Sequence, residues 1–342
     1  MAVSIADVAP GVKPPDELPH VLERLRQESL TPGLELVGPP KPLSGGFWAE
    51  MWTLALTQPA GLLPEKVVLR LAPDPLAAAR ETAVQAAVAA QGYPTPLIHA
   101  SDTGRGDLRA WSVMDFATGD PLLAGLNGVR ALTSLPRLAM DLPDTLARAA
   151  VELHRLDPEP VAAELDTLVA ESAGINRLLE HYISHVHTLD DVPLARLVER
   201  VATTRPHSKL QVICHGDLHP FNVLSNGDQY VVLDWTAARI AHPAYDLAFT
   251  RLLLANPPLH APRPLRPFIN IAALRIAKRF LTTYTKLSPH KIDADTLAWY
   301  HSLQACRILI DLASWRAAGT ADLHPGHPWF AIEPTVRLLL DA

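Results

Sequence analysis

Hydrophobic and polar positions follow short-period patterns in the first third of the chain. Brief apolar stretches separated by Gly and Pro predict strands, and two stretches with apolar residues at helical spacing predict helices. The expected helices cover 19–29 and 75–91, the second closed by Gly92. The expected strands cover 34–37, 48–56, 66–71, 97–100 and 108–116. Short strands joined by turns predict an antiparallel sheet with one helix packed near it.

The rest of the chain reads mainly as helix. The pattern breaks at Ala117-Thr118-Gly119-Asp120-Pro121, which we interpret as a boundary between a lobe of residues 1–118 and a lobe of residues 119–342. The expected helices beyond it cover 146–156, 175–186, 194–201, 245–254, 269–284 and 296–315. With 342 residues the chain is long enough for two such lobes.

One stretch of the second lobe departs from the helical pattern. Residues 212–235 read VICHGDLHPFNVLSNGDQYVVLDW, and they predict short strands at 212–214, 222–225 and 230–233. Asn226-Gly227 is a strong hairpin signal. A turn there folds the last strand back along the one before it. Asp234 is then expected beside the loop of residues 217–222.

The polar residues of this stretch suit phosphoryl transfer. An amide oxygen from Asn222 and a carboxylate from Asp234 are ligands that Mg²⁺ accepts, with its other positions left for water and phosphate. A separate carboxylate, Asp217, is placed to receive the proton of a hydroxyl. Phosphoryl transfer needs this kind of positioning and charge neutralisation more than covalent chemistry.

HGDLHPFNVL followed by VVLDW resembles the aminoglycoside phosphotransferase and choline kinase family. The resemblance implies an α+β, two-lobe protein-kinase-like fold, in which a small N-terminal lobe holds an antiparallel sheet and one helix and a larger C-terminal lobe is mainly helical. It implies that Asp217 is the catalytic base, that Asn222 and Asp234 bind Mg²⁺, and that His215 supports the loop. The role of His219 stays open between backbone hydrogen bonding and catalysis.

The resemblance also predicts nucleotide-binding positions in the first lobe. Val68-Leu69-Arg70 matches the family strand, so Arg70 is preferred over Lys66 as the cation on the phosphates, with Glu81 as its partner. Ser44, Gly45 and Gly46 are expected to form the turn over the phosphates, although a plain hairpin would explain them too. ATP is expected to bind between the lobes, its adenine at the hinge formed by Met114, Asp115 and Ala117.

Two further residues match family positions but are interpreted as structural. Asp246 is expected to hydrogen-bond the catalytic loop or cap a helix. His154 is expected to be a core residue with its hydrogen bonds satisfied rather than a ligand. Cys214 and Cys306 lie in apolar segments and are interpreted as small buried hydrophobes.

Composition narrows the partners. A net charge of −6 argues against a nucleic-acid partner, and no apolar run reaches the ~20 residues that a membrane span needs. The first residues lack a secretory signal, so we expect a cytoplasmic protein. From residue 251 onward, eleven basic residues stand against six acidic ones, which favours a neutral or anionic acceptor over a polycationic aminoglycoside. Aromatic residues there line either the acceptor pocket or the core: Trp299, Tyr300, Trp315, Trp329 and Phe330.

The sequence therefore predicts an ATP- and Mg²⁺-dependent kinase that phosphorylates a hydroxyl of a small metabolite or antibiotic. The alternative is a nucleotide-binding module that has lost catalysis and acts through protein partners, because a Gly-Gly turn is weaker than a full Gly-rich loop. Protein kinase activity is disfavoured, since no activation segment follows Asp234-Trp235.

Overall fold

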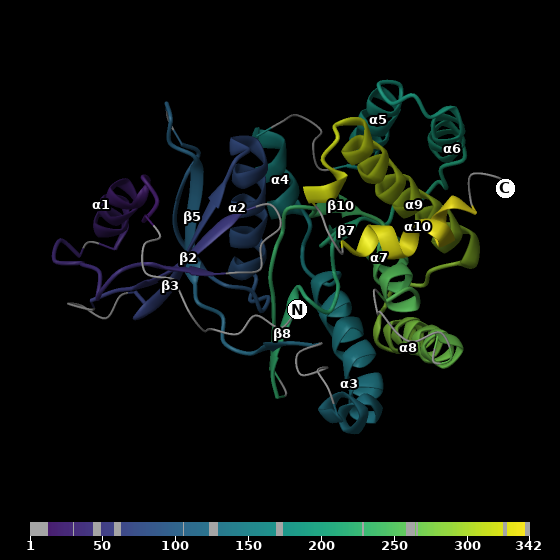
Figure 1. The fold of residues 1–342 in the computed structure, drawn as a ribbon, viewed down its shortest axis with the longest axis horizontal. Helices are drawn as coiled ribbons and strands as arrows, with labels where there is room; N and C mark the ends of the chain where they lie inside the picture. Colours follow the sequence, from purple (N-terminus) through teal and green to yellow (C-terminus); the bar gives the residue numbers. More distant parts are fainter. Residues whose placement is uncertain are drawn as a thin grey trace.

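A computed structural model describes most of the chain, in a sheet-bearing N-terminal part and a mainly helical remainder that lie side by side (Figure 1). The expected α+β fold class is thereby confirmed. The expected Gly-Gly turn of Ser44, Gly45 and Gly46 lies outside the described residues. The described residues are 13–29, 31–43, 49–57, 63–104, 106–122, 129–168, 174–227, 229–257, 264, 266–323 and 327–338.

The N-terminal part is built on a five-stranded antiparallel sheet in the order β1-β2-β3-β5-β4. The central strand β3 matches its prediction almost residue for residue, because its apolar side chains are buried and its neighbours pair with it along its whole length. The strands are β1 (Lys41–Leu43), β2 (Glu50–Ala55), β3 (Lys66–Ala72), β4 (Ile98–Asp102) and β5 (Ala110–Asp115).

The expected strand at 34–37 is wrong. Only Leu36 forms an isolated bridge, to Leu56, and the first strand of the sheet is instead β1. Gly38, with a φ of 84°, and the two prolines after it interrupt the extended run, so regular pairing starts only beyond them.

Two helices cover this sheet, and both were predicted. α1 (Leu18–Glu28) packs Val21 and Leu25 into the core of the sheet. α2 (Pro75–Ala90) starts where the Asp74 carboxylate accepts the backbone N–H groups of the next turn at 2.9 and 3.2 Å. Its inner face buries Glu81 among apolar residues, which is the position that the site uses.

Helices dominate the C-terminal part, and three of them differ from the prediction. α3 begins far earlier than expected, because Pro136 and Pro143 interrupt the helical pattern of its sequence. α10 was not predicted, because Pro334 lies inside it. α4 was not predicted either. The helices are α3 (Val129–Leu153), α4 (Glu159–Leu168), α5 (Ile175–Val186), α6 (Val192–Thr203), α7 (Ala244–Ala255), α8 (Arg266–Leu287), α9 (Ala294–Ala317) and α10 (Pro328–Arg337).

Short strands between the helices carry the polar stretch of residues 212–235. β7 (Val212–Cys214) pairs with β10 (Arg239–Ala241), and β8 (Val223–Asn226) pairs with β9 (Gln229–Val232). The expected hairpin is confirmed, with Asn226 opposite Gln229, one residue later than a turn centred on Asn226-Gly227. β6 (Asp120–Pro121), just after the expected lobe boundary, pairs with β8 and joins the two parts.

Four of the five candidate pocket aromatics lie in the core, and the fifth, Phe330, is partly buried and packs against it. Trp299, Tyr300, Trp315 and Trp329 are each less than 10% exposed and belong to the same apolar cluster of the C-terminal part. Cys214 and Cys306 are also buried and unpaired, as expected. Among the described residues, no helix combines the length and apolar character that crossing a membrane requires.

Candidate active site

The stretch after β7 forms a loop that is held from several sides, with His215 at its start. The buried His215 ring donates from Nε2 to the carbonyl of Leu233 at 2.9 Å, and its Nδ1 accepts the backbone N–H of Asp217 at 3.2 Å. A carbonyl can only accept and an amide N–H can only donate, so these partners define a neutral ring. Burial lowers the pKa of His215, which agrees with the neutral form. His215 thus ties the loop to the residue before Asp234.

A buried carboxylate supports the same loop from behind. Asp246, fully buried in the first turn of α7, accepts the backbone N–H groups of His215 and Gly216 at 2.8 and 2.7 Å. His154 Nε2 lies 3.2 Å from the same carboxylate, and its Nδ1 lies 2.8 Å from the hydroxyl of Tyr284. Asp246 therefore hydrogen-bonds this loop, as expected, and both ring nitrogens of the buried His154 have hydrogen-bond partners, as expected.

Gly216 cannot be replaced by a residue with a side chain. Its φ is 76°, and a Cβ atom built on it would lie 2.2 Å from the carbonyl oxygen of Ala237. The loop therefore packs directly on the backbone that follows Asp234.

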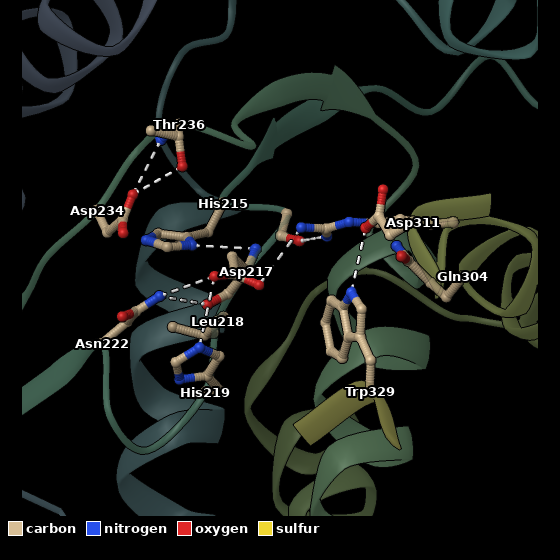
Figure 2. A network of polar contacts seen from close by, with 12 residues as sticks. His215, Asp217, Leu218, His219, Asn222, Asp234, Thr236, Gln304, Asp311 and Trp329 are labelled. Carbon is tan, nitrogen blue, oxygen red and sulfur yellow. Dashed lines mark hydrogen bonds and ion pairs between the residues drawn. The ribbon is translucent and has the colours of Figure 1, made fainter. Parts of the chain in front are cut away.

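Asp217 lies between polar groups on both sides, as Figure 2 shows with Asn222 and His219 on one side and Asp311 and Trp329 on the other. Its Oδ2 accepts Asn222 Nδ2 at 3.1 Å and lies 3.4 Å from His219 Nε2. Burial opposes ionisation of the Asp217 carboxyl, but the charge and hydrogen bond of His219 and the charge of Arg307 outweigh it and hold its pKa well below its usual range. Asp217 is therefore an ionised carboxylate at neutral pH.

Asn222 is held by its amide nitrogen and its backbone. Nδ2 donates to the Asp217 carbonyl at 3.0 Å as well as to the carboxylate, and the Asn222 carbonyl accepts the N–H of Leu233 at 2.8 Å. This orientation leaves the amide oxygen as the atom that Asn222 presents to a cation. The hairpin register brings Asp234 directly beyond this pair.

Asp234 has an uncommon backbone conformation. Among the residues that the structure describes, it is the one non-glycine residue with a positive φ, 64°. One carboxylate oxygen, Oδ1, accepts the Thr236 hydroxyl at 2.7 Å and lies 3.9 Å from Arg70 Nη2. The loop backbone thus aims this carboxylate at the N-terminal part, where the cation predicted for the phosphates lies.

Arg70 and Glu81 form a buried ion pair between β3 and α2. Arg70 Nε and Nη2 lie 3.1 and 3.0 Å from Glu81 Oε2. The expected pairing of these two residues is present, and Arg70 rather than Lys66 makes it. Burial raises the pKa of Glu81 to about 7, with Asp234 adding to the rise and Arg70 opposing it.

The expected hinge ends β5. The Asp115 carboxylate lies 2.7 Å from His99 Nε2 and accepts the Leu97 N–H at 3.1 Å, while the Asp115 N–H donates to the Leu97 carbonyl at 3.0 Å. The Met114 sulfur lies 3.7 Å from Gln85 Nε2. The Asp115 side chain and N–H are therefore occupied in holding the sheet edge, and the adenine contacts expected from Met114, Asp115 and Ala117 stay a prediction.

The sequence reading missed Arg307 on α9. Its Nη1 donates to the carbonyl of Gly216 at 2.6 Å, and its Nη2 lies 3.6 Å from Asp217 Oδ1. The signal was present in the sequence: Arg307 and Asp311 are four residues apart in a helix whose other positions there are mostly apolar. Charged residues on such a face are rarely left without a role.

The sequence of this chain matches a known enzyme family. The model of the phosphotransferase enzyme family matches residues 41–290, and the chain belongs to this family. It is therefore an enzyme of the phosphotransferase class. A curated relative, the aminoglycoside 3'-phosphotransferase of Streptomyces fradiae, is 29% identical over 227 residues, which cover 62% of this chain and 73% of the relative.

Solved structures share the fold. A Ralstonia eutropha protein provisionally assigned as an aminoglycoside phosphotransferase matches 95% of this chain and 96% of its own, with 19% identity and a TM-score of 0.63. The macrolide 2'-phosphotransferase of Brachybacterium faecium matches 94% of this chain and 99% of its own, with 18% identity and a TM-score of 0.55. A spectinomycin phosphotransferase solved with ADP and spectinomycin matches 95% of this chain and 97% of its own, with 13% identity and a TM-score of 0.56.

Proposed function

We propose that this chain is a Mg²⁺-dependent kinase that transfers the γ-phosphate of ATP to a hydroxyl group of a small molecule. The observation that carries the proposal is the convergence of Asp217, Asn222 and Asp234 on one loop and hairpin, with the Arg70–Glu81 pair facing Asp234. Buried turn residues with no catalytic role would not require a carboxylate aimed by a left-handed backbone.

The donor atoms fit a magnesium ion. The Asn222 amide oxygen and the Asp234 carboxylate are hard oxygen ligands, and two protein ligands are the usual number for Mg²⁺ beside phosphates. When bound, the ion neutralises charge on the phosphates of the nucleotide. Arg70 adds a fixed positive charge on the same side, held in place by Glu81.

Asp217 acts on the acceptor. Its carboxylate accepts the hydrogen bond of the acceptor hydroxyl and aligns the oxygen with the γ-phosphorus. The new O–P bond forms as the bond from the γ-phosphorus to the bridging oxygen breaks, ADP leaves, and the hydroxyl proton passes to Asp217 and then to solvent. A carboxylate with a low pKa is a weak base, so its main contribution is orientation, with proton transfer late in the reaction.

The remaining nucleotide contacts are proposed from their places in the sequence. Met114 packs beside adenine and the backbone near Ala117 bonds its edge, while Ser44, Gly45 and Gly46 contribute backbone N–H groups to the phosphates. An ATP-dependent enzyme of this kind is expected in the cytoplasm, without a nucleic-acid or membrane partner. No observation favours the inactive nucleotide-binding module, because each of Asp217, Asn222 and Asp234 is present and oriented.

Asp217→Ala tests the proposal. We expect the variant to bind MgATP as the wild type does in a thermal-shift titration, but to transfer phosphate to hydroxylated acceptors about 10²- to 10⁴-fold more slowly, the usual contribution of a general base. Asp144→Ala is the matched control, since it removes a carboxylate from an exposed ion pair with Arg279. Equal transfer rates for wild type and Asp217→Ala would remove Asp217 from the mechanism. MgATP binding without transfer to any acceptor would favour the inactive module.

A further inference from the structure

The side of Asp217 that faces away from the hairpin is formed by Arg307. Its guanidinium lies 3.6 Å from Asp217 Oδ1 and donates to the carbonyl of Gly216 at 2.6 Å. The Arg307 side chain is 19% exposed, so its charge is mostly shielded from water. Arg307 comes from α9, 91 residues beyond the loop that it contacts. It is thus a C-terminal contribution to the environment of the proposed base.

Two aromatic rings lie against this guanidinium. Its Cζ atom lies 5.0 Å from the ring centre of Phe249 and 5.7 Å from that of Trp329. The Trp329 indole N–H donates to Asp311 at 3.1 Å, and Asp311 is one helical turn after Arg307. The backbone carbonyl and the two rings favour this position of the guanidinium, so displacing it for a substrate cation would break these contacts.

The charges around Asp217 leave little negative potential for an acceptor amine. The Arg307 guanidinium lies 3.6 Å from Asp217 Oδ1, and the His219 Nε2 lies 3.4 Å from Oδ2, while His219 Nδ1 accepts the Phe221 N–H at 3.2 Å. Asp311 is a further carboxyl on this side, and burial raises its pKa, which weakens it as a counter-charge. A protonated amine next to the reacting hydroxyl would therefore meet a fixed guanidinium and a carboxylate whose charge is already compensated.

We propose that Arg307 is a specificity-determining residue that directs the enzyme to hydroxyl compounds whose reacting end is neutral or acidic, and away from compounds with an ammonium group beside that hydroxyl. This inference rests on the proposed function, because it assumes that the acceptor hydroxyl reaches Asp217. It is independent of the phosphate-transfer step, since the selectivity arises on binding. The same guanidinium positions Asp217 through the Gly216 carbonyl.

A binding screen tests the selectivity without requiring turnover. The wild type with MgADP is titrated by thermal shift against three sets of hydroxylated compounds of similar size, bearing amines, no charge or carboxylates. Hits are quantified by calorimetry, together with kanamycin and its fully N-acetylated form, which keeps the skeleton and removes the positive charges. We expect the amine-bearing compounds to bind at least about tenfold more weakly than their uncharged counterparts, a difference of about 1.4 kcal/mol.

Variants assign this preference to Arg307. Arg307→Gln is expected to reduce the ratio of the affinity for uncharged compounds to the affinity for amine-bearing compounds about tenfold, with the MgADP affinity unchanged. Arg307→Lys keeps the charge and is expected to keep this ratio. Arg316→Gln is the matched control, since it removes an arginine of the same helix that pairs with Glu333 at the surface. A merely structural role of Arg307 would lower all affinities together and leave the ratio as it is.

The outcomes separate the two proposals. Three results would overturn the role of Arg307. The wild type could bind amine-bearing compounds most tightly, or bind no neutral or acidic compound at all. The ratio of affinities for uncharged and amine-bearing compounds could also be the same in Arg307→Gln as in the wild type. If Arg307→Gln does not fold, the wild-type ranking and Arg307→Lys still decide. Selective binding with no phosphate transfer would leave the Arg307 inference standing and overturn the proposed kinase activity. Efficient phosphorylation of amine-bearing acceptors would support the proposed kinase activity and overturn the Arg307 inference.

Discussion

Two arginines flank the polar stretch of residues 215–234, the buried Arg70 and the partly buried Arg307, and they are held in different ways. Arg70, on the nucleotide side, has two contacts with the Glu81 carboxylate at 3.0 and 3.1 Å. Arg307, on the acceptor side, is held by the Gly216 carbonyl at 2.6 Å and by the rings of Phe249 and Trp329. The first depends on a carboxyl whose pKa is raised by burial to about 7, and the second on groups that do not titrate near neutral pH.

This difference is expected to separate the two proposed functions of the site, nucleotide binding and acceptor binding. The charge that holds Arg70 changes over the physiological pH range, so nucleotide binding is expected to depend on pH. The contacts that hold Arg307 keep their character over the same range, so acceptor selectivity is expected to be constant. Variants of each cluster should therefore affect different kinetic constants.

Arg70→Gln should give the largest effect of the three changes that probe this contrast. We expect the KM for ATP to rise about 10- to 100-fold, because hydrogen bonds to charged groups contribute about 1.5–3 kcal/mol. Steady-state kinetics with varied ATP measure it. Arg307→Gln serves as the contrasting variant and should leave the KM for ATP within about twofold, because Arg307 contacts Gly216 and Asp217 rather than Arg70, Glu81 or Asp234. An unchanged KM for ATP in Arg70→Gln would mean that Arg70 does not contact the phosphates.

A change of pH should give the next largest effect, through Glu81. With a pKa of about 7, Glu81 passes from about nine-tenths ionised at pH 8 to about one-tenth at pH 6, so the KM for ATP should rise about tenfold as pH falls. The stability effect has the opposite sign. Because the pKa of Glu81 is raised on folding, the native state favours the protonated form. The resulting contribution of Glu81 to the free energy of unfolding is fully present below pH ~4.5 and is lost as pH rises through about 7.

Glu81→Gln is the control for both pH effects. The variant cannot titrate at this position, so its KM for ATP should stay high and nearly constant from pH 6 to 8. Its urea midpoint should lose the part of the pH dependence that Glu81 causes. A wild-type KM that does not change with pH, or an identical pH dependence in Glu81→Gln, would contradict this assignment.

Asp311→Asn should give the smallest effect. The amide keeps an oxygen to accept the Trp329 N–H, and burial already weakens the charge of Asp311, so the acceptor KM and the acceptor selectivity should change by less than about threefold. Kinetics with the best acceptor found by screening measure it. A change of tenfold or more in the acceptor KM or the acceptor selectivity would show that Arg307 depends on an ionised partner. The surroundings of Arg307 would then resemble those of Arg70.

The sequence could predict the catalytic stretch because its geometry is local. β7 has the predicted bounds, and a hairpin of a few residues is enough to bring Asp234 beside Asn222. The order of residues alone then conveys the spatial arrangement. The Arg70–Glu81 pair was also within reach, because one strand and the next helix hold it.

The acceptor side could not be predicted in the same way. The contact between Arg307 and Gly216 spans 91 residues, and its formation depends on how α7, α9 and α10 pack together. α10 itself was missed because Pro334 lies inside it. The aromatic residues nearby were visible in the sequence, but burial rather than residue type decides that they form core.

The left-handed conformation of Asp234 implies that this position is maintained against its own folding energetics. A non-glycine residue with a φ of 64° carries a steric cost that a glycine at the same position would avoid. Substitution to glycine there would remove this steric cost, while deleting the carboxylate and its contact with the Thr236 hydroxyl. A chain under no selection for catalysis would be free to drift in that direction, so an aspartate at position 234 is a residue that selection for thermal robustness alone would not retain.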